Sequence, residues 1–397
     1  MWKSLIVFVL VLPVCLSGQT ASDVVRPFLG VAAPGSRAAG LAQSYAGVAN
    51  DYSAMHYNPA GMAHITRAEL SFGGTYYSLN NTYYTNYGES IASDISRSYY
   101  NTDNVAYIWP VYGMKFTLGV GYTASSVFNQ AFSVEAVDFS ETTNEESLLG
   151  AYTISGGYQL QKELSMGVSF HLYKGNNTYT NQHVEPENTY SFQISSDYTG
   201  IGLTIGILWA PADFARTGIT LKTPTYLDVD ELYTENEETR YDYRIQSPPE
   251  IMLGQSFTMG NLLLTGSLSW RDWSLSRFHQ DPNYPIESPD GQPIDIPINN
   301  TIKSDFQSTL AYAGGAEFLL PWWNAKIRGG ARHIPSHRRN DESANRLILA
   351  GGGSVVLAQQ FKIDFSYSRA IWENRYSDNE RADITNTWST VTFSYRF

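Results

Sequence analysis

Residues 35–61 read GSRAAGLAQSYAGVANDYSAMHYNPAG, and this stretch differs from everything that follows it. It is rich in Gly, Ala and Ser and lacks the alternating aromatic residues of the later chain. Small residues let backbone pack closely against backbone, which suits a plug in a narrow space. Asp51 is placed to cap a short helix over residues 52–57, and Pro59 moves Asn58 out of the helical region. By itself the stretch fits a compact insert as well as an ordinary loop-and-helix segment of a soluble domain.

The composition of the 397-residue chain narrows the class of protein. Charged residues make up 16% of it, whereas they are about a quarter of a typical soluble protein, and there are 28 Tyr and 32 Gly. Beyond the N-terminus no run approaches the ~18 consecutive apolar residues that a membrane helix needs. The net charge of -12 argues against nucleic acid as a partner. These features favour a large all-β protein.

The N-terminus predicts a secretory signal peptide over residues 1–17. Lys3 supplies the positive end, the apolar core is short, and small residues precede the expected cleavage before Gly18. The alternative, a membrane anchor, would need a longer core. Cys15 is the only cysteine of the sequence, so the cleaved chain would have no thiol or disulfide chemistry.

Fourteen runs with alternating apolar and small or polar residues follow the quoted stretch. In one of them Met166, Val168 and Phe170 alternate with such residues. Successive side chains of a strand point to opposite faces, so each run has one apolar face. The runs cover residues 68–79, 103–112, 114–123, 149–160, 163–175, 199–210, 214–224, 249–258, 262–271, 308–319, 324–334, 346–357, 361–371 and 386–396.

The connections between these runs alternate between long and short. An even number of strands, with short turns at one rim and long loops at the other, is typical of outer-membrane barrels. A soluble β-sandwich has no reason to sort its loops by length. We therefore expect an all-β fold, a transmembrane antiparallel β-barrel of about 14 strands over residues 68–397. It would be a multi-pass protein of the bacterial outer membrane, in contact with its lipids, with residues 18–67 as a hatch that plugs the lumen.

The ends and loops of the runs add three expectations. The last run ends the protein on Phe397, which resembles the recognition signal of the barrel-assembly machinery. Trp322 and Trp323 lie at a short turn, where an aromatic girdle would meet the membrane interface. The loop over residues 174–198 is polar with scattered aromatics, and the Pro-rich loop over residues 272–303 should be extended rather than helical.

Together these features resemble the FadL/TodX family of outer-membrane transporters for long-chain fatty acids and other hydrophobic compounds. The carrying motif is Asn58-Pro59-Ala60, which matches the NPA box of that family's hatch, flanked by Gly35-Ser36-Arg37-Ala38 and Asn50-Asp51. Residues 218–224 and 269–274 look like its late strands. The resemblance spans essentially the whole mature chain.

The resemblance implies a route for a hydrophobic ligand. The ligand is caught at the outer loops, enters beside the hatch and leaves sideways through a gap made by a kink in the third strand. In this chain Gly119 and Gly121 are the positions of that strand that would permit a kink. Glycines that only relieve crowding near the plug are the alternative. The polar character of residues 174–198 departs from the apolar capture groove of relatives.

Alternation also predicts which charged residues face the lumen. If Phe318, Ile327 and Phe365 face lipid, their charged neighbours face inward near the short-turn rim. These inward residues are Glu317, Lys326, Arg328, Lys362 and Asp364. We expect them to pair with one another and with polar hatch groups such as Asp51, and thus to hold the plug in a structural role.

The sequence offers little sign of catalysis. Its seven His are scattered, and it has no HExxH or GxSxG motif and no Gly-rich loop between a strand and a helix. We expect no enzyme activity, no metal and no cofactor. A second hypothesis is a PorV-like barrel that serves as a partner in protein secretion or surface attachment. An apolar tunnel beside the hatch would favour transport of a hydrophobic small molecule, and an occluded polar lumen would favour the partner role.

Overall fold

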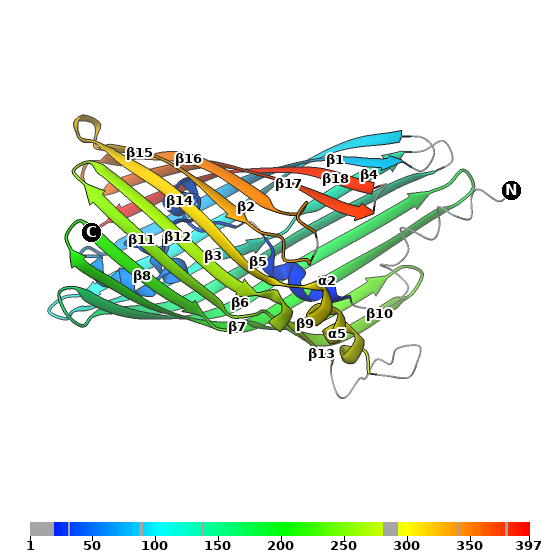
Figure 1. Ribbon diagram of the computed structural model, residues 1–397, viewed down its shortest axis with the longest axis horizontal. Coiled ribbons are helices and arrows are strands. Elements are labelled where there is room, and N and C mark those ends of the chain that lie inside the picture. The colour runs from blue at the N-terminus through cyan, green and yellow to red at the C-terminus, as the bar shows by residue number, and fades with distance from the viewer. Residues whose placement is uncertain are drawn as a thin grey trace.

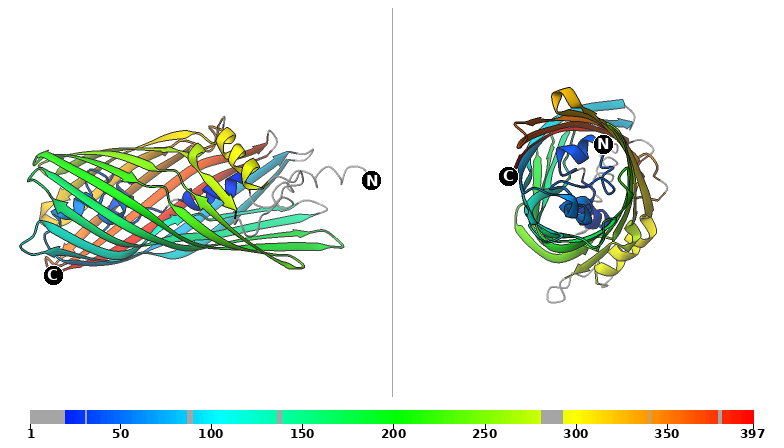
Figure 2. Two further views of the ribbon diagram at one scale, coloured as in Figure 1. Left: turned by 90° about the horizontal axis from the view of Figure 1, so that it is seen from below. Right: turned by 90° about the vertical axis from the view of Figure 1, so that its left-hand side faces the viewer.

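The computed structural model describes residues 20–30, 32–86, 90–135, 139–280, 293–339, 341–377 and 380–397. The predicted signal peptide lies outside these residues. The chain forms one long barrel whose wall consists of strongly tilted strands (Figure 1). The C-terminus lies at the end with the short turns, and the outer hairpins reach different heights at the opposite end (Figures 1 and 2).

Eighteen strands form a single sheet in the described part of the chain. Their bounds are β1 Glu69–Asn86, β2 Ser90–Val111, β3 Phe116–Val127, β4 Gln130–Glu135, β5 Ser140–Gln159, β6 Leu164–Val184, β7 Thr189–Ala212, β8 Ala215–Lys222, β9 Tyr226–Thr234, β10 Glu238–Gln246, β11 Glu250–Met259, β12 Leu262–Asp272, β13 Arg277–Gln280, β14 Ser308–Leu320, β15 Ala325–Ile334, β16 Arg346–Leu357, β17 Phe361–Ser377 and β18 Glu380–Arg396.

These strands occupy fourteen positions around the barrel. β3 and β4 both pair with β5, and β8 and β9 both pair with β7, so each of these two pairs is one interrupted strand. β10 with β11 and β12 with β13 share a position in the same way. β1 pairs with both β2 and β18, which closes the barrel, and every pairing is antiparallel. The expected antiparallel barrel of about 14 strands is confirmed.

Three neighbouring strands are interrupted at nearly the same height. Residues 223–225 separate β8 from β9 and contain Pro224, and residues 247–249 separate β10 from β11 and contain Pro248 and Pro249. Proline has no N–H to donate to a sheet ladder, which explains both breaks. Between β12 and β13 the 3-10 helix η4 (Trp273–Leu275) replaces the strand. The wall therefore changes direction along one side of the barrel.

Residues 20–68, here called the N-terminal segment, form short helices and turns before the first strand. The helices are α2 Ala21–Val25, η2 Arg26–Phe28, α3 Ser36–Gly40, α4 Ala54–Tyr57 and η3 Pro59–His64. Further along, α5 (Asp295–Asp305) lies between β13 and β14, and η5 (Pro321–Trp323) lies between β14 and β15. None of the described helices combines the length and apolar character needed to cross a membrane.

The N-terminal segment lies inside the barrel (Figure 2, right). Close backbone contact with the wall depends on glycine. A Cβ at Gly218 would lie 2.0 Å from the carbonyl oxygen of Ala46, and one at Gly254 would lie 2.5 Å from the backbone nitrogen of Gly47. Contacts this short exclude any side chain, so the small residues at these positions allow the segment to dock.

The outward face of the barrel is apolar at positions that alternate with buried ones. On β7, Ile201, Ile205 and Ile207 are exposed, whereas Thr204 and Leu208, at the alternate positions, are buried. Such an outward apolar face fits a protein surrounded by lipid.

Three local expectations from the sequence are wrong. Residues 174–198 are mostly strand, because β6 and β7 stay paired up to Val184 and Thr189. The Pro-rich loop contains helix α5, with Pro297 in its first turn, where proline is tolerated. The helix expected after Asp51 starts later, at Ala54, and its N-cap is Ser53. The Asp51 carboxylate accepts hydrogen bonds from the Ser53 amide and hydroxyl instead.

Candidate functional site

A cavity of about 210 Å³ lies between the N-terminal segment and the barrel wall. Part of its lining is apolar. Phe28 and Leu29 come from the N-terminal segment, Leu149 and Tyr173 from β5 and β6, and Trp273 from η4. The residues of the interrupted strands, such as Thr223, also reach it. These residues would give apolar contact to a side chain or ligand tail in the cavity.

The rest of the lining carries charge around Glu250, at the start of β11. The Glu250 carboxylate lies 2.6 Å from Arg271 Nη2 and 3.8 Å from Lys222 Nζ, and it accepts a hydrogen bond from Ser269. The Arg271 guanidinium also lies 4.8 Å from the ring of Trp273. One carboxylate therefore balances two cations from neighbouring strands.

Two more arginines line the cavity, and neither has a carboxylate partner among the described residues. Arg332 donates to the side-chain oxygen of Gln43. Arg346 donates to the carbonyl of Leu29 at 2.7 Å. With Lys222 and Arg271 the described lining holds four cations and one carboxylate. The buried hydroxyl of Tyr57 has no hydrogen-bond partner there either. The site can therefore donate hydrogen bonds to an acceptor group that carries negative charge.

His56 connects the N-terminal segment to this cluster. Its Nε2 lies 3.2 Å from Lys222 Nζ, so the imidazole accepts from the ammonium and is neutral. Burial, together with the positive charge of Lys222, holds the pKa of His56 well below its usual value. His171 and Arg271 act in the same direction, and Glu250 opposes them.

This environment predicts that the docking of residues 54–57 weakens in acid. Docked His56 stays neutral, whereas undocked His56 takes up a proton below pH ~6.5. The free energy that favours docking therefore falls by up to about 1.4 kcal/mol for each pH unit below that value. Hydrogen exchange of these residues between pH 7.5 and 5.5, corrected for intrinsic rates, measures the effect. Gln can also accept from Lys222 and does not titrate, so His56→Gln should show a flatter pH profile. An equally steep profile in His56→Gln would contradict this assignment.

The five wall residues expected to face the lumen lie together inside the barrel, and they connect to the N-terminal segment through Arg37. Arg37, on α3, forms two 2.9 Å hydrogen bonds to the Glu317 carboxylate on β14. Lys326 Nζ lies 2.8 Å from the same carboxylate. Arg328 Nε lies 3.3 Å from it, a charge contact without hydrogen-bond geometry.

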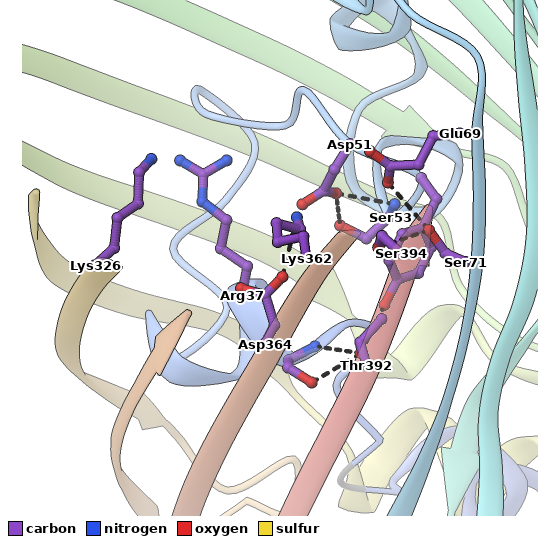
Figure 3. A network of polar contacts seen from close by, with 12 residues as sticks. Arg37, Asp51, Ser53, Glu69, Ser71, Lys326, Lys362, Asp364, Thr392 and Ser394 are labelled. Carbon is purple, nitrogen blue, oxygen red and sulfur yellow. Dashed lines mark hydrogen bonds and ion pairs between the residues drawn. The ribbon is translucent and has the colours of Figure 1, made fainter. Parts of the chain in front are cut away.

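The cluster continues from Arg328 to β17. Arg328 Nη2 and Lys362 Nζ each lie 2.9 Å from the Asp364 carboxylate. Lys362 and Asp364 point to each other in Figure 3, and the charged ends of Lys326 and Arg37 lie beside one another. Three strands and one short helix of the N-terminal segment thus share a buried ion-pair network.

Asp51 has a different role from the one expected. In the described structure it makes no ion pair with the wall, and its carboxylate turns to Ser53 (Figure 3). It also accepts a 2.7 Å hydrogen bond from the Tyr45 hydroxyl. Tyr45 in turn lies 3.3 Å from Arg37 Nη1. Asp51 therefore organises the N-terminal segment, and Arg37 makes the contact with the wall.

The Asn58-Pro59-Ala60 motif lies where η3 meets strands β6, β7 and β8. The Asn58 side-chain amide donates to the carbonyls of Ala46, at 2.8 Å, and Ile207, at 3.1 Å, and its oxygen accepts from the Ala60 amide. Pro59 occupies the first position of η3. The asparagine thus joins two turns of the N-terminal segment to the wall.

The strand that contains Gly119 and Gly121 is not broken at these glycines. Both pair in register with β2 and with β5, and a Cβ at Gly119 would crowd Met55 and Met62 of the N-terminal segment. The irregularity comes later, at Ser125, and β3 ends at Val127. Correspondingly, the described pairing of β2 with β3 stops at Asn104 and Thr123.

Beyond this point β4 pairs with β5 but, among the described residues, not with β2, and it packs against inward-facing side chains of β1 and β18. The Ala131 carbonyl accepts a 2.6 Å hydrogen bond from the inward-facing Asn81 of β1, and Ala131 packs with Leu79 and Ile384. The ladder between β2 and β3 is therefore interrupted above Thr123, and Ser125 and Ser126 at the bend line the cavity. We call this place the wall break.

The outer hairpins bring the scattered aromatic residues together. Phe192 stacks on Tyr179 of β6 at 5.8 Å and on Tyr233 of β9 at 5.7 Å between ring centroids. His183 stacks on Phe139 at 5.4 Å and lies 6.5 Å from Tyr190. An aromatic surface thus forms across β6, β7 and β9, in a region that the sequence predicted to be loop.

The short-turn rim carries the remaining predicted residues. Trp322 and Trp323 are 91% and 75% exposed. Phe397 donates its amide to the Ala68 carbonyl and packs edge-on against Tyr395 at 5.0 Å. Within the described ranges, no three His, Cys, Asp or Glu side chains are grouped as metal ligands would be.

Sequence reasoning missed Lys222, Glu250, Arg271 and Arg332. The available signal was alternation: each is a charged residue at an inward position near a strand end. Two of them lie inside the stretches 218–224 and 269–274 that carry the family resemblance. Their convergence depends on which strands become neighbours and where those strands are interrupted.

A closed antiparallel barrel with an apolar outer face, a charged interior and an internal segment defines an outer-membrane barrel protein. The sequence profile of the family described as outer membrane protein transport protein (OMPP1/FadL/TodX) matches residues 29–395. The chain belongs to this family, so the predicted family and outer-membrane location are confirmed. This is a family of transport channels for hydrophobic compounds. Comparison with curated proteins gives no match.

Several solved structures share the fold. A FadL homologue of Pseudomonas aeruginosa superposes with a TM-score of 0.68 at 14% identity, covering 93% of this chain and 99% of its own. The toluene transporter TodX of P. putida superposes with a TM-score of 0.62 at 11% identity, covering 90% of this chain and 98% of its own. The toluene transporter TbuX of Ralstonia pickettii superposes with a TM-score of 0.61 at 14% identity, covering 90% of this chain and 98% of its own.

Proposed function

We propose that the protein carries hydrophobic compounds with an acid group, such as long-chain fatty acids, through a barrel at residues 68–397 that is plugged by a hatch at residues 18–67. The observation that carries the proposal is the composition of the cavity. Its apolar lining residues suit an acyl tail, and its four cations against one carboxylate suit an anionic head group. A neutral hydrocarbon would have no use for this excess of charge.

The wall break supports a lateral exit as part of the same proposal. An acyl chain gains about 0.8 kcal/mol for each CH₂ that stays out of water, so leaving into the membrane is favoured over leaving into the periplasm. Ser125 and Ser126 belong both to the cavity lining and to the bend of the third strand. The aromatic surface around Phe192 is the proposed place of first capture, and Phe397 the proposed assembly signal.

Replacing Arg332 by methionine is expected to weaken binding of oleate by about 10- to 100-fold, because one hydrogen bond to a charged group contributes roughly 1.5–3 kcal/mol. Binding of oleyl alcohol, with the same tail and no charge, should change less than twofold. Titration of the purified protein in a non-ionic detergent measures both affinities. Arg369→Met, at an exposed position of β17, is the matched control.

Two results would contradict the proposal. One is equal affinity of the wild type for oleate and oleyl alcohol. The other is a barrel that binds neither and instead co-purifies with a secreted or surface protein in native mass spectrometry, the result expected of a secretion partner.

A further inference from the structure

The first part of the N-terminal segment, residues 20–30, here called the arm, lies between the cavity and the wall break. Phe28 and Leu29 line the cavity. Next to them the amide of Gly30 donates a 3.0 Å hydrogen bond to Ser126 Oγ at the bend of the third strand. A Cβ at Gly30 would lie 2.1 Å from that oxygen and 2.5 Å from the Val127 amide nitrogen. The arm backbone therefore fits directly against the wall break.

Residues 21–28 of the arm are firmly packed, because Ala21, Val24 and Val25 are buried in an apolar cluster with α5 and the barrel wall. Their polar contacts include Arg26 to Glu145, at 3.4 Å, and Arg338 to the Ser22 hydroxyl, at 3.1 Å. By comparison, the remainder of the segment has the bidentate Arg37–Glu317 pair and the three hydrogen bonds of Asn58. Residues 29–30 contact the wall through the hydrogen bonds from Arg346 to the Leu29 carbonyl and from Gly30 to Ser126, so this end of the arm can separate from the wall while residues 21–28 and 36–62 stay docked.

Arg346 connects the arm to the ligand site. It lies at the start of β16, lines the cavity and donates a 2.7 Å hydrogen bond to the Leu29 carbonyl, one residue before Gly30. Its guanidinium also lies 4.8 Å from the Trp372 ring. Among the described residues no carboxylate neutralises it. A hydrogen bond from arginine to a carboxylate is about twice as strong as one to a neutral carbonyl.

We propose that Arg346 couples the acid group of a bound ligand to the contact that closes the wall break. A carboxylate entering the cavity takes the Arg346 donor from the Leu29 carbonyl, and Gly30 then leaves Ser126. A neutral ligand leaves the Arg346–Leu29 hydrogen bond in place, so the arm stays closed. This inference rests on the proposed acid ligand and lateral exit, and it adds the residue that links them.

Hydrogen exchange of the full mature chain in non-ionic detergent tests the coupling with oleate and oleyl alcohol as probes. Oleate should speed exchange at residues 29–30 at least tenfold and leave residues 36–62 unchanged, whereas oleyl alcohol should change neither more than twofold. In Arg346→Met residues 29–30 should exchange fast without ligand and respond no further. Arg369→Met should behave like the wild type.

A second variant tests the other end of the coupling. Gly30→Ala leaves Arg346 intact but cannot fit against Ser126, so residues 29–30 should exchange fast before oleate is added while oleate still binds. Oleate that binds the wild type without speeding exchange at residues 29–30 would overturn the coupling and leave the transport proposal standing. An equal response to oleyl alcohol would also overturn it. Failure of oleate to bind at all would remove both proposals.

Discussion

Glu317→Ala is expected to lower the free energy of local opening of residues 36–62 by about 3–5 kcal/mol, the usual cost of removing one partner from a buried ion pair. Arg37 would keep its place in the barrel without the carboxylate that its Nε and Nη2 contact at 2.9 Å. Lys326 would lose its carboxylate partner as well, and Arg328 would keep only Asp364. Hydrogen exchange of residues 36–62 measures the free energy of local opening.

Controls distinguish the buried network from surface charge. Asp228→Ala breaks an exposed pair with Arg244 on the outer strands and should cost less than about 1 kcal/mol. Lys326→Met should cost less than Glu317→Ala, because the Lys326 side chain is 38% exposed. Removing both partners, in Arg37→Met with Glu317→Ala, should recover part of the loss. Unchanged protection in Glu317→Ala would mean that the network does not hold the N-terminal segment.

Asn58→Leu is expected to have the second-largest effect, lowering the free energy of local opening of residues 54–62 by about 3 kcal/mol or more. The leucine has a similar size but leaves the Ala60 amide and the Ala46 carbonyl without their partner inside the barrel, and each unsatisfied buried group costs about 1–3 kcal/mol. Space is not available for adjustment, since a Cβ at Gly206 would already lie 2.1 Å from the Asn58 oxygen.

Local opening of residues 54–62, measured by hydrogen exchange, reports the change at Asn58. Asn176→Leu, at an exposed position of β6, is the control and should leave this region as it is. If Asn58→Leu protected residues 54–62 as well as the wild type does, the Asn58-Pro59-Ala60 motif would not be the fastening point of the segment.

Much of the fold could be predicted from the sequence because a strand has a strictly local rule. Alternation with a period of two placed fourteen runs and assigned Glu317, Arg328 and Asp364 to the inner face without knowledge of their neighbours. The same rule holds for Lys222 and Arg271, although their meeting at Glu250 was missed. The Asn58-Pro59-Ala60 motif pointed to the internal segment.

Tertiary structure alone decided which groups meet. Arg37 rather than Asp51 pairs with the wall, because the Arg37 side chain reaches Glu317 on β14, whereas the Asp51 carboxylate accepts from Tyr45 and Ser53. The third strand bends at Ser125 rather than at its glycines, since the register there depends on both neighbouring strands. The sequence by itself determined the faces of the strands, a property of successive residues. The cavity, the network and the wall break depend on contacts between residues far apart in the chain, and only closure of the barrel brings these together.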